Sequence, residues 1–279
     1  MTEHEAPTPA GRAGPSLREI PIRLIVPNLI TVIAICAGLS GVRFAFEQRY
    51  ELAVAMVLVA ALLDAIDGRA ARMLKASSKF GAQMDSLADI VNFGVAPALV
   101  LYAFLLDRAG SFGWIAALLF AIACALRLAR FNVMADDPDR PAWQADYFVG
   151  IPAPAGALLV LLPVYLAFVG VTPTPIFALV SCVYTMSIAV LMVSRLRIYS
   201  GKSQGAKIRR DLVLPVMLLV VFYLLLMANF TWITLCGSAI AYLLFLPLSM
   251  RAYARREALE AKKAEAETSA PDGEGAPEA

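Results

Sequence analysis

The stretch D-A-I-D-G-R-A-A-R, residues 64–72, is followed by eight residues and then by G-A-Q-M-D-S-L-A-D, residues 81–89. It places Asp64, Asp67, Asp85 and Asp89 in two segments that are otherwise apolar enough to lie in a lipid bilayer. A carboxylate in a membrane helix is costly, so its default interpretation is functional. Four carboxylates need positive charge to neutralise them, and the first candidate is a hard divalent cation, which prefers oxygen ligands.

The rest of the chain has the composition of a polytopic membrane protein. Of its 279 residues, 60% are hydrophobic and 16% are charged, and the mean hydropathy is +0.71. A helix needs about 20 apolar residues to cross ~30 Å of hydrocarbon. Runs of suitable length occupy residues 28–46, 52–74, 82–106, 112–133, 153–170, 175–193, 212–228 and 231–249. The connections are short, so the fold class is predicted to be an all-α membrane bundle of about eight antiparallel spans.

The basic residues predict the orientation of this bundle. Counted by connection, 21 of the 24 Lys and Arg residues fall on the side of the N-terminus, and only Arg43, Arg49 and Arg108 fall on the other side. Lys and Arg are enriched in cytoplasmic loops. Both termini and the aspartates are therefore expected at the cytoplasmic face of a multi-pass protein of the inner (cytoplasmic) membrane.

The chain divides into five predicted parts. They are a disordered N-terminal tail at 1–16, an interfacial segment at 17–26, a membrane core at 27–199, a two-helix membrane unit at 200–250, and a charged cytoplasmic tail at 251–279 that begins as a helix. Pro27 is expected to begin the first helix, because proline suits the first helical turn. Residues 17–26 alternate basic and apolar character, as a segment lying along the membrane surface does.

Helical spacing places the aspartates on facing surfaces. Asp64 and Asp67 are three residues apart and Asp85 and Asp89 four apart, so each pair shares one face of a helix. A turn at residues 79–81 would bring the two helices back antiparallel. The resulting carboxylate box suits Mg²⁺ or Mn²⁺.

The residues between the two aspartate pairs are suited to a phosphate ligand. Gly68 lets a phosphate approach the backbone, and Arg72 is placed to bind a phosphate through two hydrogen bonds. As an alternative, the aspartates could be solvated or paired with Arg69, Arg72 and Lys79. The small residues Gly68, Ala71 and Gly81 within the array favour the binding site.

At this point the sequence resembles a known family. Residues 64–89 match every fixed position of the signature D-x2-D-G-x2-A-R-x8-G-x3-D-x3-D of the CDP-alcohol phosphotransferase family. The resemblance implies a membrane enzyme with a six-helix catalytic core, usually a homodimer. Such enzymes use a divalent metal and an alcohol acceptor to displace CMP from a CDP-linked lipid.

The resemblance also implies roles for individual residues. Asp64, Asp67 and Asp85 correspond to metal ligands, and Asp89 to a metal-associated residue that serves as general base. Pro27 to Thr31 is similar to the opening motif of the family. The positions implied to hold the CDP-lipid are Asn28, Thr31, Gly68, Ala71, Arg72, Ser78 and Gly81.

Three further blocks, at residues 85–102, 125–133 and 147–155, resemble the membrane-embedded bacterial phosphatidylserine synthases of this family. That likeness implies CDP-diacylglycerol and L-serine as substrates. The candidates for acceptor binding are Asn92, Arg127, Arg130 and Asn132. Either Arg127 or Arg130 would bind the carboxylate of serine, and the alternative is that both are ordinary positive-inside anchors.

Other functions remain open from the sequence. The acceptor could be glycerol 3-phosphate, inositol phosphate or choline, although Ser86 and Ile90 depart from the phosphatidylglycerophosphate synthase pattern. The only histidine is His4, which excludes a phosphohistidine mechanism of the phospholipase D type. An ion-coupled transporter is the non-enzyme alternative, weakened because the aspartates are not repeated in the second half. No nucleic-acid partner is expected.

Overall fold

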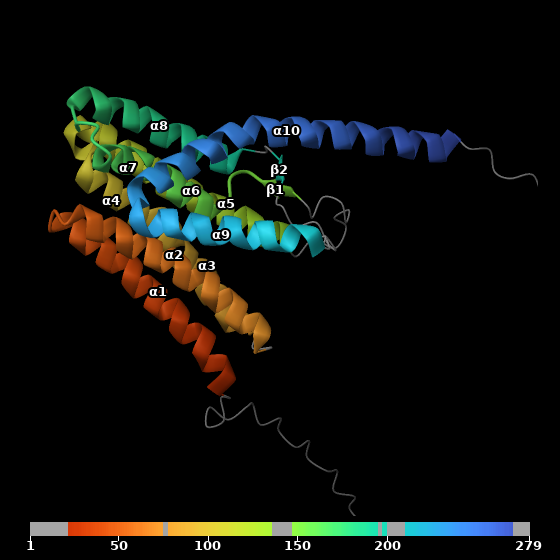
Figure 1. Ribbon diagram of the computed structural model, residues 1–279, viewed down its shortest axis with the longest axis horizontal. Helices are drawn as coiled ribbons and strands as arrows, with labels where there is room; N and C mark the ends of the chain where they lie inside the picture. Colours follow the sequence, from red (N-terminus) through yellow and green to blue (C-terminus); the bar gives the residue numbers. More distant parts are fainter. Residues whose placement is uncertain (1–21, 75–77, 136–146, 195–196, 200–209, 270–279) are drawn as a thin grey trace, which may run out of the picture.

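The computed structural model describes residues 22–74, 78–135, 147–194, 197–199 and 210–269. These residues form a bundle of antiparallel helices (Figure 1). The strands within them are β1 (Tyr147–Val149) and β2 (Arg197–Tyr199), which form one antiparallel pair. The prediction of a helical membrane bundle is confirmed, whereas the strand pair is too short to leave a pattern in the sequence. The predicted tail at 1–16, residues 17–21 and residues 270–279 lie outside the described residues.

The helices follow the predicted apolar runs. They are α1 (Ile22–Phe46), α2 (Tyr50–Met73), α3 (Lys79–Asp89), the π-helix η1 (Ile90–Val95), α4 (Ala96–Phe104), the 3₁₀-helix η2 (Leu106–Ala109), α5 (Ser111–Ala135), α6 (Ala153–Val160), α7 (Leu162–Phe168), α8 (Pro175–Val193), α9 (Arg210–Asn229) and α10 (Thr231–Ser269). Within the described residues, six helical stretches are long and apolar enough to cross a membrane. The other two of the eight predicted spans are α2, which carries charged residues near both ends, and the shorter stretch Ala153–Phe168.

Two predicted boundaries are wrong. The first helix begins at Ile22 and contains Pro27, so residues 22–26 belong to α1. A proline close to the helix start removes a single backbone hydrogen bond, and the apolar residues before it continue the helix. Residues 79–81 form the first turn of α3 instead of a loop. Ser78 caps that helix, and its Oγ accepts a hydrogen bond from the Gly81 N–H at 2.9 Å.

Two predicted spans contain breaks next to prolines. Proline cannot donate a backbone hydrogen bond and disturbs the helix just before it. Pro97 is the second residue of α4, which directly follows the π-helix η1, and Pro163 lies in the first turn of α7, where α6 has ended. π-helices are frequent at functional sites, and η1 begins directly after Asp89.

Helices α1 and α2 pack closely because small residues are frequent where they meet. The side chains of Ala34, Ala37, Ala53 and Ala60 are at most 5% exposed. A Cβ added to Gly41 would lie 2.9 Å from the backbone oxygen of Ala53. Small residues let membrane helices approach closely, and this contact fixes α2, which carries the first two aspartates, against α1.

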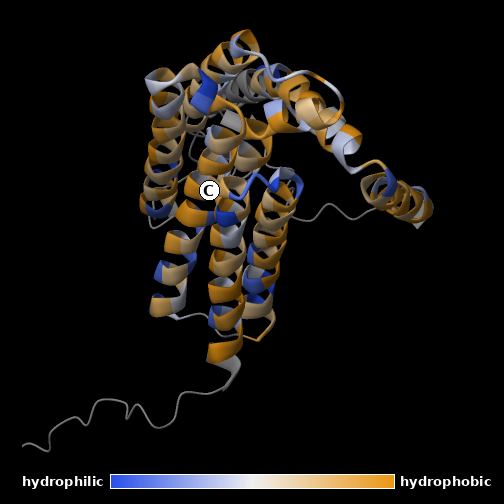
Figure 2. Cartoon of the chain, turned by 90° about the vertical axis from the view of Figure 1, so that its left-hand side faces the viewer, coloured by the Kyte–Doolittle hydropathy of each residue, from blue (hydrophilic) through white to orange (hydrophobic). Residues whose placement is uncertain are grey.

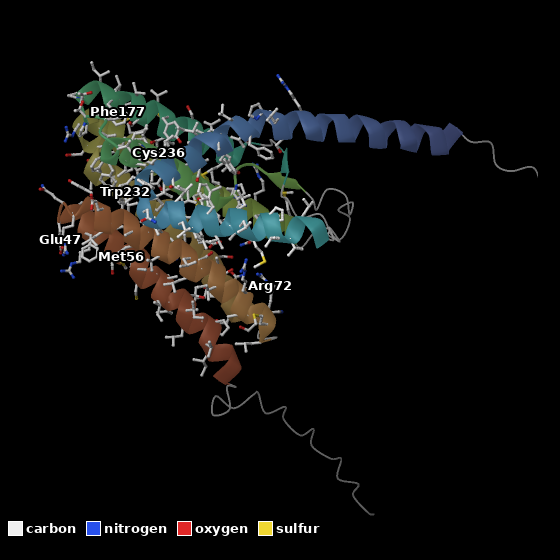
Figure 3. All side chains as sticks on the ribbon, viewed as in Figure 1. Glu47, Met56, Arg72, Phe177, Trp232 and Cys236 are labelled. Atoms are coloured by element: carbon white, nitrogen blue, oxygen red, sulfur yellow. The ribbon has the colours of Figure 1, made fainter. Side chains whose placement is uncertain are left out.

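Aromatic side chains gather at one end of the bundle. Ring contacts at centroid distances of 4.9, 5.7 and 4.6 Å join Tyr50 to Phe104, Phe104 to Phe168, and Phe168 to Trp232. In Figure 3, Glu47 and Trp232 lie at this end and Arg72 at the other. Aromatic residues of membrane proteins are enriched at the interfaces with water.

The outer surface of the bundle is apolar. Apolar residues cover most of the length of the helices in Figure 2. In the apolar part of α9, residues 212–229, no residue is buried. In a bilayer this surface faces lipid.

Candidate functional site

The aspartates of α2 and α3 come together at the end of the bundle away from the aromatic rings. Asp64, Asp67 and Asp85 each offer an oxygen, and these oxygens lie within 4.8 Å of one another. Asp89 lies close enough to Asp64 and Asp85 for the charges of these carboxylates to interact. The structure therefore brings all four predicted aspartates together, three as one group and Asp89 beside it.

The negative charge of this cluster is not balanced by contacting basic residues. Oδ1 of Asp64 and Oδ1 of Asp67 are buried without a hydrogen-bond partner. Two carboxyl groups in contact repel each other unless a proton or a cation lies between them. The predicted alternative, pairing with Arg69, Arg72 or Lys79, has no ion pair to support it among the described residues.

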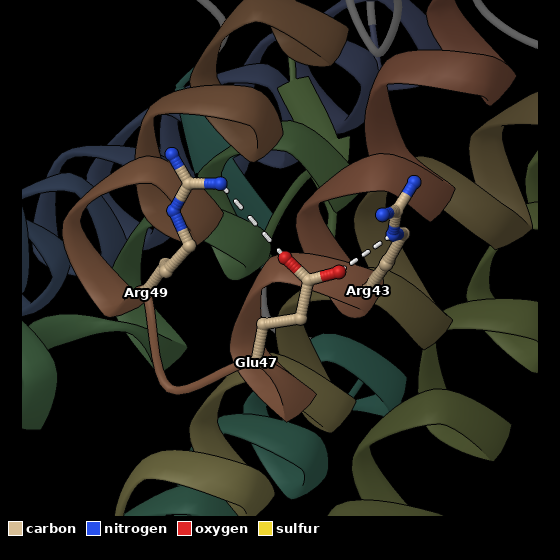
Figure 4. Close-up of polar contacts among 3 residues, drawn as sticks. All are labelled: Arg43, Glu47 and Arg49. Atoms are coloured by element: carbon tan, nitrogen blue, oxygen red, sulfur yellow. Dashed lines mark hydrogen bonds and ion pairs between the residues drawn. The ribbon is translucent and has the colours of Figure 1, made fainter.

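The ion pairs found among the described residues lie at the other end of the bundle. Glu47 contacts Arg43 at 2.8 Å and Arg49 at 3.9 Å (Figure 4). The aspartate cluster is thus an all-oxygen donor set with unused buried oxygens, which is the chemistry that Mg²⁺ and Mn²⁺ require. The residues present fit such an ion.

Thr31 of α1 holds one of these carboxylates in place. Its hydroxyl lies 2.6 Å from Oδ2 of Asp67, to which it donates, and 3.1 Å from the backbone oxygen of Pro27. Thr31 is 4% exposed and Asp67 is 2% exposed. The sequence implied a contact between Thr31 and the CDP-lipid, whereas the structure shows Thr31 bound to a candidate metal ligand. Partners of this kind fix the orientation of the ligand.

An open cavity of ≈ 200 Å³ lies against Asp67 and Asp85. All seven positions implied to hold the CDP-lipid line it, together with Pro27 and Ala82; those positions are Asn28, Thr31, Gly68, Ala71, Arg72, Ser78 and Gly81. These residues come from α1, α2 and the start of α3, so the cavity exists only in the folded bundle.

The backbone around the cavity suits a phosphate. A Cβ on Gly68 would meet nothing closer than a guanidinium nitrogen of Arg72 at 3.7 Å, so the backbone there is accessible. A Cβ on Gly81 would lie 3.0 Å from the side-chain oxygen of Asn28, so a larger residue there would have to displace this side chain, which lines the cavity. The N-terminus of α3 borders the cavity at Ser78, and helix N-termini attract anions.

Of the predicted acceptor residues, Arg127 of α5 approaches the carboxylates. It is 8% exposed, and its charge interacts with that of Asp89. Its Nε is buried without a partner, and its Cζ lies 5.4 Å from the centroid of the Phe131 ring. Tyr242 of α10 lies close enough to interact with it electrostatically. The sequence analysis missed Tyr242, because nothing in the sequence connects a residue of α10 with this site.

The other three predicted acceptor residues contact parts of the protein other than the aspartates. Asn92 is fully buried, and its amide oxygen would be 2.5 Å from a Cβ on Gly38 of α1. Arg130 donates a hydrogen bond to the backbone oxygen of Val193 at 2.7 Å. Asn132 donates to the Ser86 hydroxyl at 3.0 Å and so links α5 to α3. None of the three lines the cavity beside Asp67 and Asp85.

Comparison with known families agrees with this geometry. The model of the family described as CDP-alcohol phosphatidyltransferase matches residues 24–193. The chain belongs to this family. The match runs from α1 to the last residue of α8, so α9 and α10 lie outside the region shared by the CDP-alcohol phosphatidyltransferases.

Curated relatives carry the name CDP-diacylglycerol–serine O-phosphatidyltransferase. One from Mycobacterium leprae is 47% identical over 174 residues, which cover 62% of this chain and 57% of the relative. One from Mycobacterium tuberculosis H37Rv is 49% identical over 54% of this chain and 50% of the relative. The chain thus matches about half the length of these relatives. One from Bacillus subtilis is 32% identical, over 65% of this chain and 94% of the relative.

Proposed function

We propose that this member of the family transfers the phosphatidyl group of CDP-diacylglycerol to the hydroxyl of L-serine, giving phosphatidylserine and CMP. The proposal rests on the cavity beside Asp67 and Asp85. All seven residues that the family resemblance assigns to CDP-lipid binding line this cavity. The names of the relatives support serine as the acceptor.

The donor would bind with its diphosphate between the start of α3 and Arg72. Arg72 can hold phosphate oxygens through two hydrogen bonds, and the exposed backbone at Gly68 allows close approach. Asp64, Asp67 and Asp85 would hold Mg²⁺ or Mn²⁺ next to it. Such an ion neutralises the diphosphate and stabilises charge on the departing CMP.

The acceptor would lie on the other side of the carboxylates, near Asp89. The serine oxygen bonds to the lipid-bearing phosphorus in line with the bond to CMP, which breaks, and Asp89 takes the hydroxyl proton. Arg127 is the better candidate for the serine carboxylate, because its Nε is free and its charge already acts on Asp89. Arg130 is engaged with the end of α8. Positioning contributes much of the rate in such transfers.

We further propose that the reaction takes place at the cytoplasmic face of the inner membrane in a homodimer. The basic residues of the described chain support this orientation, since Arg69, Arg72, Lys79 and Arg130 lie at the aspartate end. The resemblance to the family implies both that the protein forms a homodimer and that it acts in a membrane.

An acceptor panel tests the proposed function. Purified protein is incubated with CDP-diacylglycerol and Mg²⁺ or Mn²⁺, and CMP release is measured with serine, glycerol 3-phosphate, inositol phosphate or choline. Serine is expected to give the highest rate, and chelation of the metal is expected to abolish it. Release with another acceptor but not with serine would overturn the assignment of the acceptor.

Replacement of the proposed base separates an enzyme from a transporter. Asp89→Asn is expected to lower the rate of CMP release about 10²–10⁴-fold, the usual contribution of a general base. The matched control is Asp107→Asn at the opposite end, where the carboxylate accepts a hydrogen bond from Tyr102 at 3.0 Å. Equal rates in the two variants, or no CMP release from the unaltered protein, would contradict the proposal.

A further inference from the structure

A second cavity, which we call the α6–α10 cavity, lies between the region matched by the family model, residues 24–193, and the last two helices, α9 and α10. Its volume is ≈ 170 Å³. It is lined by residues of α6, α7, α9 and α10, namely Ala155, Leu158, Leu159, Tyr165, Tyr223, Leu235, Ser238, Ala239 and Tyr242. It shares no lining residue with the cavity beside the aspartates.

The lining excludes charged ligands. It contains aliphatic side chains and four hydroxyl groups but no Lys, Arg, Asp or Glu. A nucleotide or an amino acid would enter it without a counter-charge, which is costly at membrane depth. An apolar chain with a few hydrogen-bond acceptors fits this composition.

One hydroxyl in this cavity lacks a partner. Tyr165 is fully buried, and its OH has no hydrogen-bond partner. The hydroxyls of Tyr223 and Ser238 pair with each other at 3.1 Å, and the neighbouring Tyr184 donates to the backbone oxygen of Leu159 at 2.8 Å. A buried donor is expected to have an acceptor, so a bound molecule would supply the acceptor for Tyr165.

The depth of Tyr165 indicates what that molecule is. Tyr165 lies three residues before Phe168, the end of α7, which belongs to the aromatic end of the bundle. Three residues of helix rise about 4.5 Å, so the backbone of Tyr165 lies about 4.5 Å along α7 from this end of the bundle. Lipid ester groups occupy such a depth, and acyl chains lie beneath them. The cavity can receive a lipid from the side, since Tyr223 is 42% exposed and α9 buries no residue of its apolar part.

We propose that the α6–α10 cavity binds an acyl chain of a phospholipid from the leaflet away from the aspartates. The ester carbonyl of that chain accepts the hydrogen bond of Tyr165, and the chain packs against Leu159, Leu235 and Ala239. The lipid fills the space between the family core and α10, so it joins the α9–α10 unit to the core. This site is distinct from that of the donor lipid, whose diphosphate binds at the other end of the bundle.

Photolabelling of the full chain tests this site. The protein is reconstituted in vesicles of phosphatidylglycerol that include a phosphatidylglycerol with a diazirine on one acyl chain, without CDP-lipid, serine or metal. After irradiation, labelled peptides are identified by mass spectrometry. Label is expected on the segments around residues 158–159 and 235–239.

Three variants locate the label. Ala239→Trp, which fills the cavity, is expected to reduce that label to background, whereas Leu244→Trp, at a position of α10 that is 68% exposed, is expected to leave it unchanged. Tyr165→Phe keeps the volume and removes one hydrogen bond. It is expected to reduce the label about fivefold, the effect of a single hydrogen bond on an equilibrium.

Two results would overturn the proposal. One is equal labelling of these segments in the unaltered protein, Ala239→Trp and Tyr165→Phe. The other is loss of the label when CDP-diacylglycerol is added, since the occupant would then be the donor lipid. Because Tyr165→Phe preserves shape, it decides the question even if the tryptophan variant does not fold. The assay contains no acceptor and no metal, so its failure is independent of the failure of the transferase assignment.

Discussion

A single hydroxyl, that of Thr31, links the first helix of the bundle to the carboxylate cluster. It donates to Asp67 at 2.6 Å, and the other oxygen of Asp67 has no partner. The hydrogen bond fixes the orientation of the Asp67 carboxylate and leaves its other oxygen available to bind a cation. The role of Thr31 is therefore to position Asp67, and its effect on the reaction acts through that residue.

Removal of this hydroxyl is expected to weaken metal binding. In Thr31→Val, the metal concentration for half-maximal CMP release should rise about 10–100-fold, the usual cost of losing a partner of a metal ligand, and Thr31→Ser should restore it. The matched control is Thr185→Val, since the buried Thr185 hydroxyl bonds only the backbone oxygen of Ser181 in its own helix. A fall in the maximal rate without a change in metal requirement would refute the positioning role.

At the scale of helices, the site depends on how closely α1 and α2 approach each other. Three of the cavity-lining residues come from α1 and four from α2. The approach is set near the other end of the pair by Gly41, where an added Cβ would lie 2.9 Å from the Ala53 backbone oxygen. A backbone atom cannot move aside as a flexible side chain can, so any larger residue must separate the helices.

Gly41→Ala is therefore expected to destabilise the protein although alanine favours helices. Overpacking costs about 1–3 kcal/mol, and the gain in helix propensity is at most about 1 kcal/mol. A net loss of about 1–2 kcal/mol corresponds to a fall of about 2–6 °C in the thermal midpoint of the purified protein in detergent. The control is Gly237→Ala in α10, where an added Cβ meets nothing within 4 Å. A lower midpoint for Gly237→Ala than for Gly41→Ala would contradict this explanation.

At the scale of the whole molecule, the ends of the bundle differ in chemistry. One carries the aspartates and the proposed catalytic cavity, and the other carries the aromatic rings and the Arg43–Glu47–Arg49 cluster. This polarity, together with the count of basic residues, is the basis of the proposed orientation in the membrane.

Cysteine labelling from outside intact cells tests that orientation. A Cys introduced by Ser111→Cys, at the start of α5, is expected to react with a membrane-impermeant maleimide. A Cys introduced by Arg251→Cys should react only after permeabilisation. The native Cys124, Cys182 and Cys236 are buried and Cys36 lies within α1, so the background is expected to be low. The reverse pattern would place the aspartates on the other side of the membrane.

The fold class and the helix order could be predicted from the amino-acid sequence, and the resemblance to the family pointed to the aspartates and the residues that line the cavity. Apolar runs, charge counts and the fixed spacing between Asp64 and Asp89 are properties of the chain, and the bilayer leaves few folds to such a chain. Helix starts and breaks were less predictable, as Pro27, Pro97 and Pro163 show. A proline changes only local hydrogen bonds, and whether it begins, bends or divides a helix depends on neighbouring helices.

Which side chains meet across helices could not be predicted from the sequence and is seen in the packed bundle. In the folded protein Thr31 donates a hydrogen bond to Asp67, and Arg127 lies near Asp89. Asn92 lies against α1, and Arg130 donates a hydrogen bond to the end of α8. The packing also creates the α6–α10 cavity between segments that lie far apart in the chain. Residue spacing within one helix determines which side chains share a face of that helix. Contacts between helices depend instead on how the helices pack, and glycine and alanine residues allow them to approach closely.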